Sequence, residues 1–327
     1  MKTHPITLGV FQFTINPIEP LILPPYKGST LRGGFGYAFK RVVCAIRDKE
    51  CPDCLLKEKC IYSYVFETPP PSDTKIMRKY KSAPHPFIIE PPAEKRRGYK
   101  PGDEINFGLT LIGRAIDYLP YFIYTFDELG KIGIGKGKAG YTLKEVRSDG
   151  KAIYDSGSKT LKPIPTAKID LEIPTLVKGG KGGFSDSNNT ALHLNFLTPT
   201  RILFDGHLTI DLEFHILIRN LLRRLSLLYY FHCNGDPSDW DFKGIIEQSK
   251  EIKVKEKNLR WYDWERYSGR QETRIKMGGF IGDITFEGNI EPFMALIRAG
   301  EVLHLGKGTG FGLGKYEVKD KPSIQDS

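Results

Sequence analysis

Two stretches of the chain, ELGKIGIGKGKAGYTLKEV (Glu128–Val146) and EVLHLGKGTGFGLGKYEV (Glu301–Val318), share one pattern. Each has the end of an apolar, helix-like segment, then a glycine-rich loop that contains Gly-Lys-Gly, then a short segment in which apolar and polar residues alternate. Alternation with period two indicates a strand, and a period near 3.6 indicates a helix. The sequence therefore contains an internal repeat, and such a repeat decides the architecture before any single motif does.

The residues upstream of the two stretches extend the repeat. IGRAIDYLPYFIYTFDELG (Ile112–Gly130) and FEGNIEPFMALIRAG (Phe286–Gly300) both indicate a strand end followed by a helix with a proline in its first turn. Strand, helix, glycine loop and strand form the back half of a β-α-β-β-α-β unit. The sequence thus predicts an α+β fold of two tandem ferredoxin-like (RRM-like) units.

The front halves of the two units agree less cleanly. In the first unit a strand at Ile6–Ile15 precedes a helix that we expect to begin near Ser29 as its N-cap. In the second, a strand at Leu192–Phe204 precedes a helix from about Thr209 to Phe231. The expected boundaries are an N-terminal domain at 1–150 with a cysteine-rich insertion at about 44–60, a polar linker at 151–165, and a C-terminal domain at 166–327.

Composition restricts the function classes. The chain has 327 residues, with 48 Lys and Arg against 39 Asp and Glu, for a net charge of +9. This excess favours a polyanionic partner, and nucleic acid is the first candidate. The most apolar run, Leu212–Phe231, is interrupted by histidine and arginine, so no membrane-spanning helix is expected. The N-terminus does not resemble a signal peptide, and a cytoplasmic location is predicted.

The glycine-rich loops are candidates for binding a sugar-phosphate backbone. A nucleotide-binding P-loop fails at Gly137, where a serine or threonine is required, and a dinucleotide fingerprint would precede a helix rather than a strand. The alternative is that the glycines only permit tight turns. Two such loops at equivalent places in a basic chain favour RNA contact. The predicted RNA-binding residues here are Lys136, Gly306, Lys307, Gly308, Gly310 and Gly312.

Two further segments combine basic and aromatic residues. The helix ILIRNLLRRLSLLYYF places Arg219 and Arg223 on one side, although such arginines can also extend from a core helix to solvent. The segment Leu259–Phe280 interleaves Arg266, Arg270 and Arg274 with tryptophan and tyrosine, as in proteins that stack RNA bases, or as in a solvated hairpin with a buried aromatic face. The run Lys95–Lys100 is predicted to be a flexible basic loop.

Four of the five cysteines are clustered as C-x6-C-x2-C-x5-C. This spacing predicts tetrahedral zinc ligation with a structural role, and an iron–sulfur cluster, which uses the same ligands, stays an alternative. The predicted ligands are Cys44, Cys51, Cys54 and Cys60. Cys233 stands apart and is expected to be buried.

No metalloprotease, serine hydrolase or two-metal nuclease motif is present, which leaves general acid–base chemistry. RNA supplies its own nucleophile, the 2′-OH, so cleavage needs only groups that move protons and a cation at the phosphate. His304 is the leading candidate because it immediately precedes the second glycine loop. His85 and His207 are weaker candidates, and a structural role is the alternative for each histidine.

These features resemble a known family. LRGGFGYAFK (Leu31–Lys40), YSYVFETPPP (Tyr62–Pro71), PHPFIIEPP (Pro84–Pro92), the segment Arg266–Gly288 and GKGTGFGLGKYEV (Gly306–Val318) are similar to the repeat-processing endoribonuclease of the RAMP superfamily of CRISPR-associated proteins. The resemblance implies metal-independent cleavage of CRISPR precursor RNA within its repeats, which leaves a 2′,3′-cyclic phosphate and a 5′-hydroxyl. CRISPR repeat RNA is the implied partner, together with other CRISPR effector subunits.

In many family members a tyrosine, a histidine and a lysine at the start of the first helix carry out the reaction. Tyr26 matches the tyrosine, and Lys27, Arg32, Lys40 or Arg41 can supply the cation, but this region has no histidine. Tyr26, Lys27 and Lys40 are the predicted catalytic residues of this region, and Arg32 is predicted to bind RNA. Either His304 or His85 completes the site, or a lysine or arginine replaces the histidine. A non-catalytic RNA-binding subunit of a CRISPR effector is the alternative function, and a zinc-dependent DNA-binding regulator is a third.

Overall fold

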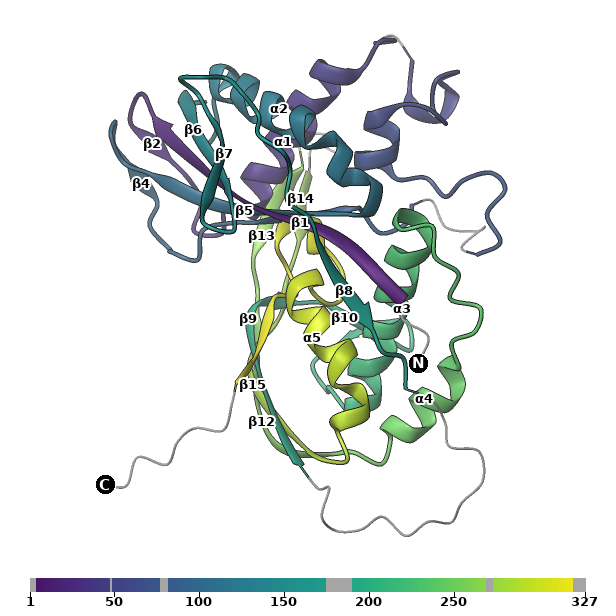
Figure 1. Cartoon of the computed structure of the whole chain (residues 1–327). Coiled ribbons are helices and arrows are strands. Elements are labelled where there is room, and N and C mark those ends of the chain that lie inside the picture. The colour runs from purple at the N-terminus through teal and green to yellow at the C-terminus, as the bar shows by residue number, and fades with distance from the viewer. Residues whose placement is uncertain (1–3, 48, 77–81, 175–189, 269–272, 320–327) are drawn as a thin grey trace, which may run out of the picture. The chain divides into compact units, whose positions relative to one another are not determined.

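The computed structural model describes residues 4–47, 49–76, 82–174, 190–268 and 273–319. The chain divides into two compact units, and Figure 1 labels most of their helices and strands. We call residues 6–168 with 231–234 the N-terminal unit, and residues 169–230 with 235–319 the C-terminal unit. The residues at 4–5 group with the second unit.

The N-terminal unit is an antiparallel sheet of strand order β3-β5-β1-β6-β7 with two helices. Its central strand β1 pairs with β5, where Phe13 lies opposite Phe107, and with β6, where Phe13 lies opposite Val146. A separate short pair joins β2 and β4. The bounds are β1 (His4–Pro17), β2 (Leu21–Ile22), α1 (Gly28–Val43), β3 (Phe87–Glu90), β4 (Gly98–Tyr99), β5 (Ile105–Ile112), α2 (Leu119–Ile132), β6 (Tyr141–Ser148) and β7 (Lys151–Asp155).

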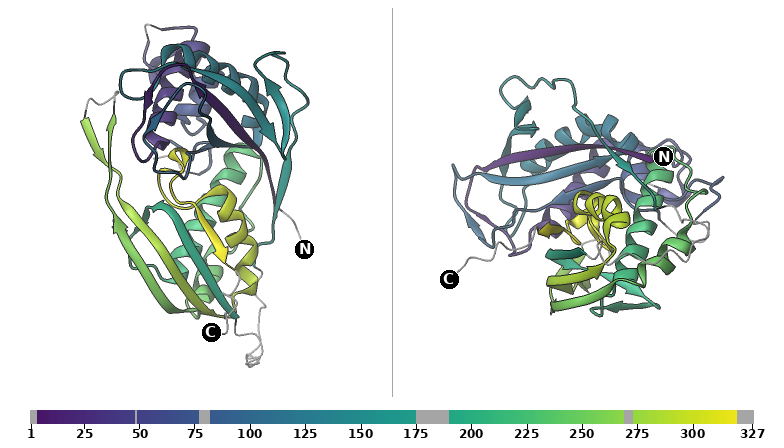
Figure 2. Two further views of the ribbon diagram at one scale, coloured as in Figure 1. Left: turned by 90° about the vertical axis from the view of Figure 1, so that its left-hand side faces the viewer. Right: turned by 60° about the horizontal axis from the view of Figure 1, so that its bottom comes forward.

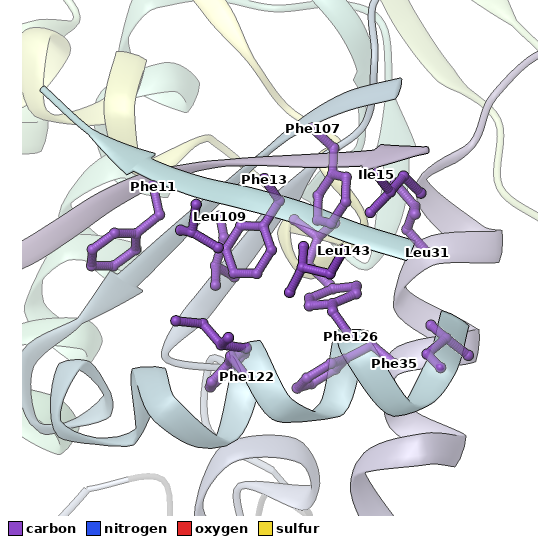
Figure 3. Packing of buried hydrophobic residues seen from close by; sticks show 14 of the residues in the cluster. Phe11, Phe13, Ile15, Leu31, Phe35, Phe107, Leu109, Phe122, Phe126 and Leu143 are labelled. Atoms are coloured by element: carbon purple, nitrogen blue, oxygen red, sulfur yellow. The ribbon is translucent and has the colours of Figure 1, made fainter. Parts of the chain in front are cut away.

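Aromatic side chains fill the space between this sheet and its helices (Figure 3). Phe126 of α2 lies 5.2 Å from Phe13 and 4.9 Å from Phe107, measured between ring centres. Phe35 of α1 stacks on Phe126 at 5.3 Å and on Phe122 at 4.7 Å. Both helices therefore cover the same face of the sheet, and burial of these rings is the main source of stability in the unit.

The C-terminal unit has an antiparallel sheet of order β12-β15-β9-β16 (Figure 2). Phe214 of α3 packs on Phe286 of β15, and the Tyr316 hydroxyl of β16 donates to the Ile297 backbone oxygen of α5, so both helices lie on one face. A hairpin joins β10 to β11, and β13 pairs antiparallel with β14. The bounds are β9 (Thr190–Thr200), β10 (Ile202–Phe204), β11 (His207–Thr209), α3 (Phe214–His232), α4 (Phe242–Ser249), β12 (Lys253–Tyr262), β13 (Glu265–Ser268), β14 (Thr273–Lys276), β15 (Gly279–Gly288), α5 (Met294–Leu303) and β16 (Tyr316–Lys319). Strand β8 (Ala167–Leu171) lies at the division between the units.

The two units repeat one packing detail. Tyr141 begins β6, and its hydroxyl donates to the Phe126 backbone oxygen of α2 at 2.8 Å, as Tyr316 at the start of β16 does to Ile297 of α5 at 2.6 Å. In each unit the glycine that follows on the helix makes room for that tyrosine. A Cβ on Gly130 would lie 2.2 Å from the Tyr141 backbone oxygen, and one on Gly300 would lie 2.2 Å from the Tyr316 hydroxyl oxygen.

The prediction of a mixed helix and sheet fold is confirmed, with antiparallel pairing between neighbouring strands along β3-β5-β1-β6-β7 and β12-β15-β9-β16. Some details of the prediction are wrong. Helix α1 begins at Gly28 with Lys27 as its N-cap, so Ser29 lies inside the helix. Helix α3 begins only at Phe214, because 207–209 forms the second strand of a hairpin. The segment 151–165, predicted as a linker, contains β7, which pairs with β6.

Candidate functional site

Tyr26 and Lys27 precede helix α1 and have contrasting environments. Tyr26 is half-buried, and burial together with the Glu90 carboxylate raises the pKa of its phenol well above the ordinary value. The phenol is therefore neutral at pH 7, where it can donate a hydrogen bond but cannot act as a base. Lys27 is fully buried, and burial lowers the pKa of its ammonium group while Glu94 opposes that effect.

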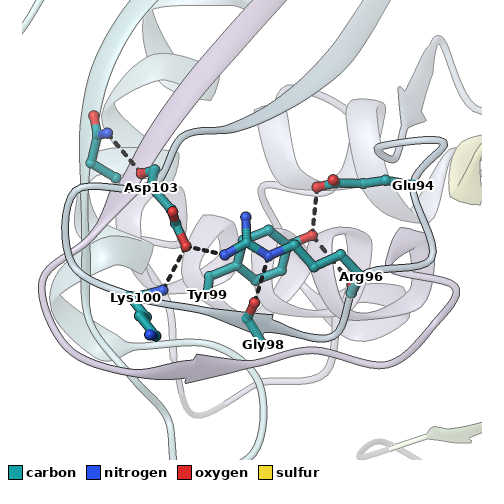
Figure 4. A network of polar contacts seen from close by, with 7 residues as sticks. Glu94, Arg96, Gly98, Tyr99, Lys100 and Asp103 are labelled. Atoms are coloured by element: carbon teal, nitrogen blue, oxygen red, sulfur yellow. Dashed lines mark hydrogen bonds and ion pairs between the residues drawn. The ribbon is translucent and has the colours of Figure 1, made fainter.

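The partners of Lys27 come from the loop that ends in β4. The Lys27 Nζ donates to the Glu94 backbone oxygen at 2.7 Å and lies 5.9 Å from the centre of the Tyr99 ring. In Figure 4 the Tyr99 hydroxyl donates to Glu94 Oε1 at 2.7 Å, and Arg96 forms an ion pair with Asp103. The segment Lys95–Lys100, predicted to be a flexible basic loop, contains the short strand β4, which pairs with β2, and its flexibility stays a prediction.

Arg32 lies on the second turn of α1 and contacts two residues that are distant in sequence. Its Nη2 is 3.0 Å from His85 Nε2, and its guanidinium carbon lies 4.5 Å from the centre of the Phe66 ring. His85 Nδ1 is 2.7 Å from the hydroxyl of Thr68. Arg32 and His85 are both half-buried. Thus the structure brings the alternative histidine to the start of α1, where the resemblance expects one.

The other cations of α1 lie further along the helix. Lys40 is two turns beyond Arg32, which is about 12 Å along the axis. It is half-buried, with its Nζ 5.8 Å from the Tyr62 ring. Arg41 is exposed and donates to the Tyr37 hydroxyl at 3.3 Å. The structure therefore groups Arg32 with His85 and places Lys40 and Arg41 near the opposite end of α1.

His304 is fully buried. It caps the end of α5 at a φ of 59°, and its Nδ1 lies 3.0 Å from the Leu313 backbone oxygen. Because no part of its ring reaches solvent in this arrangement, direct contact with a substrate would require the loop to move. A catalytic role for His304 stays a prediction. His207, the weaker candidate, is exposed in the β10–β11 hairpin.

The two Gly-Lys-Gly loops are attached to their units in the same way. The Lys136 backbone N–H donates to the Ile22 backbone oxygen at 3.0 Å, and the Lys307 N–H donates to the Arg201 oxygen at 2.9 Å. Ile22 and Arg201 both follow the first strand of their unit. Both lysine residues are exposed. Each loop is therefore fixed by its backbone while its lysine faces solvent.

The glycines of the second loop have structural reasons to be glycine. Gly306, Gly308 and Gly312 have φ values of 79°, 81° and 80°, a region that favours glycine. Gly310 is buried in the short 3-10 turn at Thr309–Phe311. The alternative that these glycines only permit tight turns therefore explains why they are glycine. Their contact with RNA stays a prediction.

The remaining predicted RNA-binding residues lie in the C-terminal unit. Arg219 and Arg223 are exposed on one side of α3, while the adjacent Arg224 is buried and donates to the Leu303 oxygen at 2.6 Å. Arg266 of β13 stacks on Phe311 of the glycine loop at 4.9 Å, and burial lowers the pKa of its guanidinium. Arg270 lies outside the described residues, and Arg274 has a described backbone in β14 only.

The four clustered cysteines are free thiols and half-buried. Burial raises the pKa of the Cys51 thiol, and Cys44 and Cys60 lie close enough to add to the increase. Within the part of the chain that the structure describes, however, no three His, Cys, Asp or Glu side chains are arranged to hold a metal ion. The structure does not support the predicted zinc site, and metal analysis of the purified protein would test it.

Sequence reasoning did not identify Thr68 and Phe66 as partners of the candidate site. Both belong to the segment Tyr62–Pro71 that carries the family resemblance, but their chemistry is ordinary and their spacing from Arg32 fits no motif. Thr68 has a φ of 51°, and a positive φ is unusual for a β-branched residue. A threonine before three prolines was the only available signal.

Two family models match the chain. The model of the CRISPR-associated endoribonuclease Cas6 matches residues 194–316, and a model described only as an N-terminal domain matches residues 6–166. The resemblance to repeat-processing endoribonucleases of the RAMP superfamily, predicted from the sequence, is confirmed by the first match.

Individual proteins show similarity along most of the chain. An uncharacterized protein of Archaeoglobus fulgidus is 23% identical over 302 residues, which are 91% of this chain and 93% of that protein. A Cas6 product complex has a TM-score of 0.54 at 16% identity, over 95% of this chain and 100% of that chain. A partial Cas6-RT-Cas1–Cas2 complex has a TM-score of 0.56 at 15% identity, over 97% of this chain and 47% of that chain. At these identities the solved structures show a shared fold.

None of the helices in the described ranges is both long and apolar enough to cross a membrane.

Proposed function

We propose that this chain is a metal-independent endoribonuclease that binds CRISPR precursor RNA and cleaves it within its repeats. The observation that carries the proposal is the match of residues 194–316 to the Cas6 endoribonuclease model, which covers most of the C-terminal sheet and the glycine-rich loop. The shared fold with a Cas6 product complex and the net charge of +9 support it. A cytoplasmic location stays a prediction.

The proposed reaction is an internal transfer of the phosphodiester. The 2′-oxygen attacks phosphorus while the bond from phosphorus to the 5′-oxygen breaks. The 2′-OH gives up one proton and the leaving 5′-oxygen gains one, so that no water or metal is consumed. The products are a 2′,3′-cyclic phosphate and a 5′-hydroxyl. The candidate groups are Tyr26, Lys27, Lys40 and His304, of which Tyr26 is protonated at neutral pH and suits donation.

We place the phosphate contacts of the RNA on exposed cations. Lys136 and Lys307 are held at equivalent loop positions with their side chains in solvent, and Arg219 and Arg223 are exposed on α3. These positions suit phosphate binding, which needs accessible charge more than enclosed geometry. Arg266 stacks beside the glycine loop and is a further candidate, as are Arg270 and Arg274.

We also propose that both units are ferredoxin-like. In the N-terminal unit the strands that come first to fourth along the chain are β1, β3, β5 and β6. In the sheet they lie side by side as β3-β5-β1-β6, which is the order second, third, first, fourth. The strands β9, β12, β15 and β16 of the C-terminal unit lie in the same order. In both, a helix follows the first and the third strand. The same order and the matched tyrosine contacts support one duplicated β-α-β-β-α-β unit.

A non-catalytic RNA-binding subunit is the second candidate function. Two observations favour it: α1 contains no histidine, and His304 is fully buried. The shared fold with a protein solved in a Cas6-RT-Cas1–Cas2 complex supports a proposal that this chain too assembles with other CRISPR proteins.

Cleavage in EDTA distinguishes the two functions. Purified protein is incubated with a 5′-labelled transcript of a CRISPR repeat encoded in the same genome, and the products are separated on a denaturing gel. We expect a product that ends in a cyclic phosphate, identified by mass spectrometry. Tight binding without any product would support the RNA-binding subunit, and preference for duplex DNA in competition would contradict both.

A further inference from the structure

Arg32 is held by side chains from two other segments of the N-terminal unit, one that contains Phe66 and one that contains His85. Its Nη2 is 3.0 Å from His85 Nε2, and its guanidinium lies over the Phe66 ring at 4.5 Å. The His85 ring is itself stacked on Phe66 at 6.2 Å and on Phe87 at 5.6 Å, with interplanar angles near 20°. A guanidinium on an aromatic face with a fixed edge contact loses most of its rotational freedom.

The partners also fix the direction of each hydrogen bond. Arginine has only donors, so His85 Nε2 must accept from Arg32. A neutral imidazole then carries its proton on Nδ1, which donates to the Thr68 hydroxyl at 2.7 Å. The Thr68 hydroxyl in turn donates to the Val65 backbone oxygen at 3.3 Å. These bonds form one continuous chain that ends on the backbone and keeps the His85 acceptor directed at Arg32.

The backbone around this chain of hydrogen bonds is unusual. Thr68 is buried and has φ and ψ of 51° and 48°, a conformation that is strained for a β-branched residue. Its N–H donates to the Ser63 oxygen at 2.7 Å, and its oxygen accepts from the Ala83 N–H at 2.8 Å. On α1, Gly36 leaves the space that the Phe66 ring occupies. Strain and close packing of this kind are concentrated at functional sites.

We infer that Arg32 binds the scissile phosphate and stabilises the extra negative charge that it acquires during attack by the 2′-oxygen. His85 is then a positioning residue, which acts through Arg32 and does not exchange a proton with the RNA. The inference rests on the proposed endoribonuclease function and names its cation. A guanidinium that is already oriented costs no reorganisation when the charge develops, which is the condition for effective electrostatic catalysis.

The test measures single-turnover cleavage and RNA affinity for a set of variants, in EDTA, with the labelled repeat transcript described above. Arg32→Ala should slow cleavage about 100-fold or more, the usual loss for one such donor, with a much smaller change in Kd. Arg32→Lys should recover part of the rate, because the charge returns without the planar fork. Arg147→Ala, which removes an exposed arginine of β6 paired with Glu145, is the matched control and should cleave like the wild type.

Substitutions at His85 test the positioning role. His85→Phe keeps the ring stack on Phe66 and Phe87 but removes the acceptor, so cleavage should slow about 10-fold, and His85→Gln, whose amide oxygen can accept from Arg32, should recover part of the loss. If His85 acts only through Arg32, adding His85→Phe to Arg32→Ala should cause no further loss. Thermal unfolding of each variant confirms that the unit is folded.

Each outcome decides a separate point. If the wild type cleaves the RNA and Arg32→Ala cleaves it at the same rate, the inference is overturned and the endoribonuclease proposal stays intact. A further loss in the double variant would show that His85 contacts the RNA itself, which overturns its positioning role. Binding without cleavage by the wild type would overturn the endoribonuclease proposal, and the inference with it.

Discussion

Two glycines of helix α1, three residues apart, provide a direct test of the packing below Arg32. Gly33 is exposed, and a Cβ added there would meet no atom within 4 Å. Gly36 is buried, and a Cβ added there would lie 2.1 Å from the Phe66 Cζ. Replacement of glycine by alanine inside a helix stabilises it by about 0.5–1 kcal/mol when nothing else changes. This gain is common to both positions.

The difference between the two alanine variants therefore isolates the Phe66 contact. At 2.1 Å the ring must move, and overpacking of this kind costs about 1–3 kcal/mol. We expect Gly33→Ala to raise the free energy of unfolding by about 0.5–1 kcal/mol. The free energy of unfolding of Gly36→Ala should be about 1–3 kcal/mol lower than that of Gly33→Ala. For a unit of 150–250 residues, that gap corresponds to roughly 2–12 °C in Tm.

The assay is thermal and urea unfolding of both variants in the full-length protein, followed by circular dichroism. Phe66→Leu added to Gly36→Ala supplies the control, because the smaller side chain should relieve the contact and recover part of the loss. Equal stability of Gly33→Ala and Gly36→Ala would refute the reasoning, since it would mean that Phe66 does not occupy the space beside Gly36. The position of the ring under Arg32 would then be wrong as well.

Two further predictions concern charge. Lys307→Ala should weaken RNA binding and reduce the slope of log K against log salt by about 0.7, which is the contribution of one phosphate contact in a single strand. Lys257→Ala is the control, because Lys257 is exposed on β12 and paired with Asp211, and it should change neither the affinity nor the slope. Equal slopes for the wild type and both variants at several salt concentrations would remove Lys307 from the interface. Burial raises the pKa of Tyr64 from 10.0 to about 12, so its neutral form contributes stability that is complete below pH 10 and lost as the pH rises through 12. Tyr64→Phe should flatten the fall in stability between pH 10 and 12 measured by urea unfolding, and an unchanged slope would contradict this assignment.

The duplicated part of the fold could be predicted from sequence because its signals are local. Each Gly-Lys-Gly loop, its proline-initiated helix and its short strand lie within one continuous stretch, and the periodicity of each element identifies it. The start of α3 was harder to predict, because the polar residues that follow β9 form a hairpin first. A tight hairpin turn and the first turn of a helix favour similar residues, so the boundary is ambiguous in sequence.

The candidate site could be predicted only in part, for a different reason. Arg32 was identified from its place on the first helix, but its partner His85 is 53 residues away and reaches it only because β3 brings the preceding loop beside α1. His304 was selected for its position next to the glycine loop, and its burial could not be predicted from that position. Its positive φ at the end of α5 accompanies a ring that is buried against the loop backbone.

In the two Gly-Lys-Gly loops, the fold places different requirements on the glycine and on the lysine. A Cβ on Gly135 would lie 2.3 Å from the Ile22 oxygen, and one on Gly306 would lie 2.5 Å from the Arg201 oxygen. Both glycines are therefore needed for the backbone contact that attaches the loop, whether or not RNA binds. The lysine that follows each glycine has no such constraint, because only its backbone N–H takes part in that contact and its side chain is exposed. The proposed phosphate contact supplies a reason for a solvent-facing cation at both equivalent positions, which the backbone contact alone does not require.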